Sequence, residues 1–356
     1  MTARVGRVLG IAFTVCFATG LLSHYQYTPW RWLPIPAAPL WGYRLTQGVH
    51  VITGIACIPL ILVKLWSVYH RLFSWPGVRS LTHALERLSI AVLVSASVLQ
   101  LVTGFFNVLQ FYPWHWDFKI VHYWLSFVII GSLLLHIAVQ LPAIREGLAT
   151  PIWKPTSSGP VSGPSRRGVL IAATVGVGVV AATTVGQVLP PLESVDLLAP
   201  RQPKNGPQEL PINVTAQDAR VSTAARSPQY RFTVEGPRPL TMSLAELEAL
   251  PTVETTLPIA CVEGWSRSAR WRGPGLLDLV EQAGGSAESM VTVVSLQQGG
   301  YSSSHLTGTQ LEHAVLATHL NGERLSLDHG YPLRLIAPDR AGVLQTKWLT
   351  RIELRS

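Results

Sequence analysis

Five apolar stretches limit the folds open to this chain of 356 residues. Each is long enough, or nearly so, to cross the hydrocarbon core of a bilayer, which takes about 20 helical residues. They cover approximately residues 8–23, 47–63, 88–111, 119–141 and 168–189. With 48% hydrophobic residues, 13% charged residues and a mean hydropathy of +0.29, the chain is too apolar for an ordinary soluble enzyme. We therefore predict an N-terminal, all-α membrane bundle of four helices plus a fifth anchoring helix.

The first apolar stretch follows Arg4 and Arg7, as a signal peptide would. Four further stretches follow it, and no clear small-residue cleavage site is present. We therefore predict that the first helix is retained.

The basic charge belongs to the apolar half of the chain. The formal net charge is +8, with a pI near 9.7. Residues 1–189 carry 13 Lys and Arg against 3 Asp and Glu, whereas residues 190–356 carry 15 against 17. Loop charges beside membrane helices set topology, so a nucleic-acid partner is not needed to explain the excess.

The basic residues also predict an orientation. With the N-terminus in the cytoplasm, ten of them fall on the inner side and three on the outer side, which is the expected bias. An odd number of spans then puts the C-terminal domain of this multi-pass membrane protein outside the cytoplasm. The inner ones are Arg4, Arg7, Lys64, Arg71, Arg79, Arg87, Arg145, Lys154, Arg166 and Arg167, and the outer ones are Arg31, Arg44 and Lys119.

Two histidines in the fourth stretch suggest haem ligation. His122 and His136 are 14 residues apart, which is about 21 Å of helix rise and leaves them within about 40° of one direction. Ionisable residues within membrane spans are functional candidates. One helix with this spacing could serve two stacked b haems, one near each membrane face.

The second ligands must come from other helices. We predict His50 as the outer partner of His122, and His83 as the inner partner of His136, with His70 as a competitor. Position 64, which lies 14 residues after His50, is lysine. The alternative is that these histidines only make helix-to-helix hydrogen bonds. The arrangement resembles the four-helix membrane cytochromes b that accompany molybdenum enzymes.

The predicted boundaries follow composition. Residues 1–145 form the cytochrome b domain, and residues 146–190 form a cytoplasmic linker and the fifth helix. Arg166 and Arg167 precede that helix as a positive-inside anchor, and they also resemble a twin-arginine export signal. Residues 191–228, which have many prolines and no sustained period, are predicted to be an extracytoplasmic linker.

Residues 229–356 predict a mostly β, α+β domain. Ser243 and Glu246 form a capping box, and a second helix covers residues 276–282. Strands are predicted near residues 230–234, 291–296, 333–336 and 347–354, with a tight turn at Asn321-Gly322.

Cys261 is the candidate reactive group of this domain. The other two cysteines, Cys16 and Cys57, lie in apolar stretches, so Cys261 has no evident disulfide partner. A thiol at the end of a strand-like run, followed by a glycine and arginines, fits a thiolate in an electropositive pocket. It also fits a small buried apolar residue.

Three motifs carry a family resemblance. Cys261-Val-Glu-Gly-Trp-Ser is similar to the molybdenum-ligand segment of the sulfite oxidase superfamily, especially its bacterial periplasmic sulfoxide reductase branch. The segments from His329 to Pro338 and from Lys347 to Leu354 resemble the closing segments of that family. The resemblance covers roughly residues 205–356.

The resemblance implies a molybdopterin cofactor with Cys261 as protein ligand to molybdenum. Arginine and lysine suit the phosphate of the cofactor. The residues expected at the cofactor are Trp265, Arg267, Arg270, His329, Arg334 and Lys347, with Arg272 as a further phosphate donor. Glu263 is a candidate for proton delivery or for a structural hydrogen bond.

The implied reaction is oxygen-atom transfer on a small extracytoplasmic substrate. We expect reduction of a sulfoxide or N-oxide, with electrons from membrane quinol passing through b haems. One alternative is sulfite-type oxidation in the reverse direction. Another is a di-haem cytochrome whose C-terminal domain only binds a partner, and a third is a thiol nucleophile with His305, His313, His319 or His329 as its base.

Overall fold

The computed structural model describes residues 2–28, 33, 36–73, 75, 77–78, 80–149, 166–185, 187–188, 194–197 and 205–355. The chain divides into two compact units. The helical unit comprises Met1–Gly20, Val49–Gly186 and Ser194–Pro200, and the C-terminal unit comprises Leu21–Gly48, Gln187–Glu193 and Arg201–Ser356. The C-terminal unit therefore includes the end of the first helix and the start of the second.

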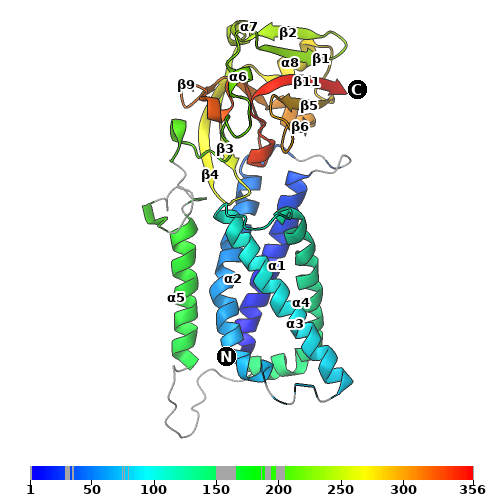
Figure 1. Ribbon diagram of the computed structural model, residues 1–356, viewed down its shortest axis with the longest axis vertical. Coiled ribbons are helices and arrows are strands. Elements are labelled where there is room, and N and C mark those ends of the chain that lie inside the picture. The colour runs from blue at the N-terminus through cyan, green and yellow to red at the C-terminus, as the bar shows by residue number, and fades with distance from the viewer. Residues whose placement is uncertain are drawn as a thin grey trace. The chain divides into compact units, whose positions relative to one another are not determined.

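Four long helices carry the first four apolar stretches, as predicted (Figure 1). They are α1 (Thr2–Tyr27), α2 (Gly42–Leu72), α3 (Leu81–Val108) and α4 (Phe118–Ala149), and each is long and apolar enough to cross a membrane. Helix α5 (Arg166–Val185) follows, but its apolar part, Gly168–Thr184, is shorter. The linker predicted before α5 lies outside the described residues from position 150 to position 165.

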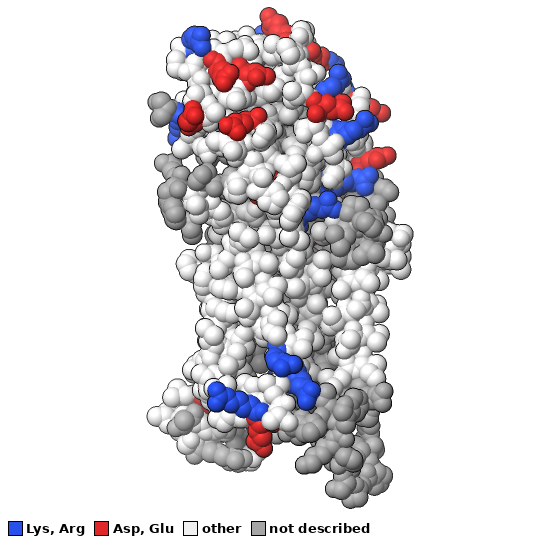
Figure 2. All heavy atoms as spheres, turned by 180° about the vertical axis from the view of Figure 1, so that it is seen from behind, with Lys and Arg blue, Asp and Glu red and all other residues white. Residues whose placement is uncertain are grey.

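The surface of these helices is apolar. Figure 2 shows a broad uncharged band over the helices on the face in view. Large apolar side chains such as Ile11, Leu62, Leu134 and Val175 are more than half exposed. Contiguous apolar surface of this kind is rare on soluble monomers, and it fits contact with lipid.

The C-terminal region is an α+β fold built on three sheets. The largest has the strand order β2 (Leu240–Ser243), β1 (Arg231–Glu235), β11 (Leu349–Arg355), β5 (Met290–Ser295) and β6 (Ser303–Leu306). Strands β1 and β11 are parallel, and the other pairs are antiparallel. The second sheet has the order β3 (Val253–Ala260), β4 (Ser266–Gly273), β8 (His319–Leu320) and β9 (Glu323–Arg324), and the third pairs β7 (Val315–Ala317) with β10 (Arg334–Ile336).

Short helices connect the strands. The predicted capping box at Ser243 opens α7 (Leu244–Ala249), and the predicted second helix is α8 (Leu276–Gln282). Asn321 and Gly322 both have positive φ in the turn from β8 to β9, as the sequence indicated. The others are η2 (Pro207–Glu209), α6 (Ser222–Ala225), α9 (Gly308–Glu312), η3 (Leu327–His329) and η4 (Gly342–Leu344).

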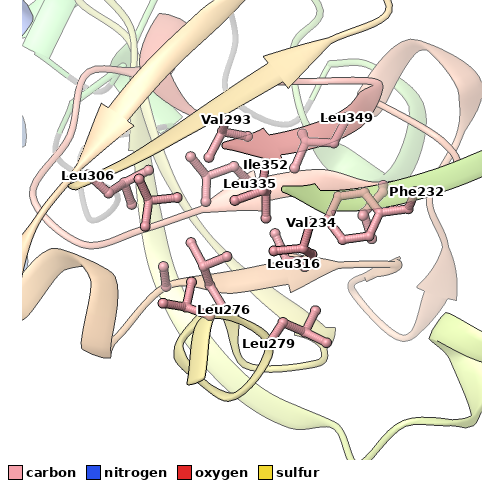
Figure 3. Close-up of a cluster of buried hydrophobic side chains, with 14 of the residues drawn as sticks. Phe232, Val234, Leu276, Leu279, Val293, Leu306, Leu316, Leu335, Leu349 and Ile352 are labelled. Atoms are coloured by element: carbon pink, nitrogen blue, oxygen red, sulfur yellow. The ribbon is translucent and has the colours of Figure 1, made fainter. Parts of the chain in front are cut away.

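Two apolar clusters form the core. In the first, shown in Figure 3, Val234, Val293 and Ile352 of the large sheet pack against Leu276 and Leu279 of α8. The second cluster lies under β3 and β4 and includes Trp271, Trp265 and Cys261 itself. The cysteine is therefore held in a packed region rather than in a loose loop.

Residues 205–228 differ from the linker expected over residues 191–228. Leu210 is buried in the same cluster as Cys261, and Val221 and Ala225 pack against Trp348. Their apolar side chains are too widely spaced among polar residues to show a helical or strand period, so the sequence pattern alone did not reveal that they are buried.

Candidate active site

The Cys261 turn, residues 261–265, joins β3 to β4 and closes on itself. The backbone N–H of Cys261 donates to the Trp265 carbonyl at 2.8 Å, and that of Gly264 donates to the Cys261 carbonyl at 3.1 Å. Gly264 has φ of +100°, a conformation that favours glycine. Trp265 is buried, and its indole N–H donates to Glu263 at 3.3 Å. These bonds hold the cysteine in a defined geometry.

The sulfur of Cys261 accepts a hydrogen bond from a residue that the sequence did not single out. The side-chain Nδ2 of Asn213 lies 2.8 Å from Sγ. Asn213 belongs to the segment expected to be a linker, and no motif marked it. An amide donor of this kind stabilises negative charge on sulfur, as a metal-ligating thiolate requires.

Three basic side chains, which we call the cation cluster, lie together near this thiol: His329, Arg334 and Lys347. Arg334 Nη1 donates to the His329 carbonyl at 3.1 Å, and Lys347 Nζ donates to the carbonyls of Asp328 and Val214, both at 2.8 Å. The charges of Lys347 and Cys261 interact, so the cluster lies near the thiol. The three residues predicted from the closing motifs are thus brought together.

The pKa values of all three residues of the cation cluster are lowered. Burial, followed by the charge of Arg334, lowers the pKa of Lys347 to about 7 and that of His329 to about 4. Burial also lowers the pKa of Arg334 to about 9. The nearby Asp328 carboxylate accepts a hydrogen bond from the Ala216 backbone. Such a site favours an anionic ligand.

A molybdopterin cofactor fits these residues. Arg334 Nε is buried with no partner among the described residues, and a guanidinium fork suits phosphate oxygens. Within the described part of the chain, no group of three or more His, Cys, Asp or Glu side chains could hold a metal.

The arginines that follow the turn are differently placed. Arg267 pairs with Glu209 at 3.3 Å. Arg270 is exposed, because alternation along β4 points Ala269 and Trp271 into the core and Arg270 away from it. Arg272 lies on the same strand, paired in register with His319. The cofactor role predicted for Arg267 and Arg270 therefore stays a prediction.

Three of the four histidines proposed as bases for a thiol nucleophile form hydrogen bonds with other groups. His329 Nε2 lies 2.7 Å from the Pro207 carbonyl, and His305 Nδ1 lies 3.0 Å from the Thr292 hydroxyl. His319 Nδ1 bonds the hydroxyl of Thr318 at 2.9 Å. These bonds give no support to a cysteine and histidine pair.

In the helical unit, His50 of α2 and His122 of α4 face each other with ring centroids 6.2 Å apart. With metal–nitrogen bonds of about 2 Å, two imidazoles on opposite sides of one metal have centroids roughly 6 Å apart. The rings also lie against glycines: a Cβ at Gly20 would be 2.8 Å from His50 Cε1, and one at Gly104 would be 3.3 Å from His122 Cε1.

The tautomers of this pair suit metal binding. His50 Nδ1 lies 2.8 Å from the Cys16 carbonyl, which can only accept, so Nδ1 carries the proton. His122 Nδ1 lies 3.3 Å from the Thr103 hydroxyl, which itself donates to the Leu99 carbonyl at 2.8 Å. Both Nε2 atoms are therefore left as acceptors, the usual state of a metal-ligating histidine.

His83 and His136, the pair predicted for the inner haem, do not lie at the same depth along their helices. Helices α3 and α4 are antiparallel, and their register is fixed by Thr103 with His122 and by Glu86 with Gln140. That register puts His136 level with position 90 of α3, so His83 lies seven residues away, about 10 Å along the axis.

Lys64, rather than His83, lies on the side of His136 where the second haem ligand was expected. Its charge interacts with His136, and its Nζ donates to the Thr2 carbonyl at 3.1 Å. The structure therefore brings together His50 and His122, and it brings Lys64 rather than His83 toward His136.

Comparison with known proteins agrees with the C-terminal site. Residues 219–356 match the family described as oxidoreductase molybdopterin binding domain. Over 116 residues the chain is 33% identical to the uncharacterized oxidoreductase YuiH of Bacillus subtilis (strain 168), covering 32% of this chain and 59% of YuiH. Over 152 residues it is 30% identical to the mitochondrial sulfite oxidase of Drosophila melanogaster, covering 35% of this chain and 26% of that protein.

Two further proteins are similar to this chain over a comparable share of its length. The sulfite oxidase of Gallus gallus is 32% identical over 162 residues, covering 36% of this chain and 35% of that protein. In the crystal structure of the sulfane dehydrogenase SoxCD from Paracoccus pantotrophus, the similarity covers 41% of this chain and 40% of that chain, with 22% identity and a TM-score of 0.33. The chain thus spans less than two thirds of each of these relatives.

Proposed function

We propose that the whole protein is a membrane-bound oxygen-atom transferase. Its C-terminal region is an oxidoreductase molybdopterin-binding domain of the sulfite oxidase superfamily. It would reduce a small sulfoxide or N-oxide with two electrons and two protons, releasing the reduced compound and water. The electrons would come from membrane quinol through b haem.

One observation carries this proposal. A buried thiol with an amide donor at 2.8 Å lies near the cation cluster, in which His329 and Arg334 are buried. A bound molybdopterin would supply the two-electron oxygen-transfer chemistry. Cys261 would hold the metal, Asn213 would stabilise the charge on sulfur, and Arg334, His329 and Lys347 would bind the anionic groups of the cofactor.

The haem part of the proposal rests on the outer histidine pair. A centroid distance of 6.2 Å and the Nδ1 hydrogen bonds of both histidines support one b haem between His50 and His122. The second haem predicted at His136 would need a partner at its own depth, where Lys64 lies rather than His83. Quinol would then reduce the haem one electron at a time.

The cellular setting is part of the proposal. Four helices of membrane length and the distribution of basic residues support a bacterial membrane protein with a cytoplasmic N-terminus. The C-terminal domain would be extracytoplasmic, and the pair Arg166 and Arg167 at the start of α5 would assist its export.

Sulfite-type oxidation is the second candidate function. Several of the similar proteins are named sulfite oxidases, which favours it. In that direction sulfite and water would give sulfate, two protons and two electrons, and the electrons would enter the haem. Steady-state assays that offer a sulfoxide with a quinol, or sulfite with a quinone, distinguish the two directions.

Metal and haem analysis of detergent-purified protein tests the proposal. Mass spectrometry for molybdenum and a pyridine haemochrome assay should find molybdenum and b haem in the wild type. Cys261→Ser should keep the haem and lose the oxygen-transfer activity. Haem without molybdenum, from a host able to make the cofactor, would instead indicate a membrane cytochrome with an accessory domain.

A further inference from the structure

The Cys261 turn is braced by residues outside the family-matched region. The side-chain Nε2 of Gln47, in the first turns of α2, donates to the Val262 carbonyl at 2.7 Å. At the other end of the turn, the backbone N–H of Ser266 donates to the Gln187 carbonyl at 2.7 Å. Gln47 and Gln187 belong to the C-terminal unit, but both precede residue 219, where the family match begins.

The orientation of the Gln47 amide is fixed by a second bond. Ser23 Oγ, near the end of α1, donates to Gln47 Oε1 at 2.6 Å. Because the Val262 carbonyl can only accept, the nitrogen of the amide must face the Cys261 turn. Ser23 and Gln47 are both buried. A buried hydrogen bond with both partners fixed restrains the backbone to which it is attached.

The start of α2 is also anchored independently of Gln47. The Asp339 carboxylate accepts hydrogen bonds from the backbone N–H of Tyr43 and from Gln26 Nε2. The buried Tyr43 side chain packs with Ala260 and Ala341. A change at Gln47 can therefore remove the brace while these contacts keep the segment in place.

We propose that Gln47 is a positioning residue of the molybdenum site. By holding the Val262 carbonyl, one residue from the thiolate, it fixes the geometry in which Cys261 meets the metal. The end of α1 and the start of α2 are then structural parts of the redox centre as well as membrane anchors. This inference deepens the proposed function, on which its molybdenum part rests.

Three variants of the full-length chain test the role of Gln47. Gln47→Glu keeps the shape of the side chain and an acceptor for Ser23, but it places an oxygen against the Val262 carbonyl. Gln47→Leu removes both bonds. Thr46→Val is the matched control, because Thr46 is the neighbouring residue on α2 and its hydroxyl donates to Gln26 at 2.9 Å rather than to the turn.

The first readout needs no cofactor. In cofactor-free protein, alkylation by a maleimide is followed by peptide mass spectrometry, which separates Cys261 from Cys16 and Cys57. We expect both Gln47 variants to react at Cys261 about 5- to 10-fold faster than the wild type, as loss of one hydrogen bond predicts. Thr46→Val should react at the wild-type rate.

The second readout is the Mo(V) electron paramagnetic resonance spectrum of the loaded protein. A displaced thiolate changes the g values, so we expect a shifted spectrum in Gln47→Glu and an unchanged one in Thr46→Val. Unchanged haem content shows that each variant is folded. If Gln47→Glu does not fold, Ser23→Ala, which frees the amide to rotate, should give a smaller increase in alkylation.

The outcomes separate this inference from the proposed function. Wild-type alkylation rates in Gln47→Leu and Ser23→Ala, or a wild-type spectrum in a folded Gln47→Glu, would overturn the positioning role. Faster alkylation in a protein that never binds molybdenum would overturn the proposed function and the molybdenum part of this inference, leaving Gln47 as a brace of the turn.

Discussion

The two proposed redox regions assemble their residues in different ways. In the helical unit, His50 and His122 meet because two helices run at a fixed spacing, and each histidine needs only one second-sphere partner. At the Cys261 site, Asn213, Gln47 and Lys347 come from segments far apart in the sequence. The helical site depends on register, whereas the thiol site depends on tertiary packing, so each should be removable without the other.

The largest expected effect is the loss of oxygen-transfer activity on changing Cys261, with the haem region left unchanged. Cys261→Ser replaces a soft thiolate with a hydroxyl, so oxygen-transfer activity should fall by more than about 100-fold, beyond the loss usual for outer-sphere changes. Haem content, measured by pyridine haemochrome, should stay at the wild-type value. Retained activity would show that the cysteine is not the metal ligand.

The reciprocal change is made in the helices. His122→Ala or His50→Ala removes one axial ligand of the outer pair, so haem content should fall by about one per chain. Molybdenum content should remain that of the wild type, because the thiol site shares no side chain with this pair. Equal haem content in wild type and both variants would show that the pair only makes hydrogen bonds.

A smaller effect concerns the cation cluster. Burial lowers the pKa of Lys347 from 10.5 to about 7 in the folded protein. Between these pH values the unfolded chain therefore binds more protons than the folded protein. The stability of the fold should rise with pH from about 7 to 10.5 because of this lysine, and the lysine destabilises the fold most below about pH 7.

Thermal unfolding of cofactor-free protein measures this pH dependence. Between pH 7 and pH 9, the midpoint temperature of unfolding should rise by a few degrees more in the wild type than in Lys347→Met. Bound anionic cofactor should reduce the difference, because an anion restores the protonated form. A parallel pH dependence in the two proteins would show that Lys347 is not buried as a charge.

The smallest expected effect tests the inner histidines. The register of α3 and α4 places His83 about 10 Å from the depth of His136. His83→Ala should therefore leave haem content and the haem spectrum unchanged. Loss of about one haem per chain in this variant would contradict the register argument and restore the pairing expected from sequence.

The sequence predicted the features that follow from periodicity and from short motifs. The four long helices, the capping box at Ser243 and the helix from Leu276 to Gln282 are all confirmed. So is the α+β character of the C-terminal region, because its turn and strand signals are local. The fold also brings together His329, Arg334 and Lys347, whose role at a cofactor stays a prediction.

The remaining features depend on contacts between distant segments. Asn213 and Gln47 are ordinary amides in a proline-containing segment and in an apolar helix, and only their tertiary neighbours give them a role. Arg270 looked like a phosphate donor because it follows the cysteine closely, but strand alternation turns it outward. The depth of His83 depends on the register of α3 with α4, which its distance from the helix start does not give.

The proposed electron transfer between the haem and the Cys261 site is tested most directly by following the haem in one preparation. Quinol is used to reduce the haem of detergent-purified protein, and a sulfoxide is then added under anaerobic conditions while the haem absorbance is recorded. We predict that the sulfoxide reoxidises the haem in the wild type and leaves it reduced in Cys261→Ser. Reoxidation at the same rate in both proteins, or none in a wild type that contains molybdenum, would contradict the proposed coupling of the two regions.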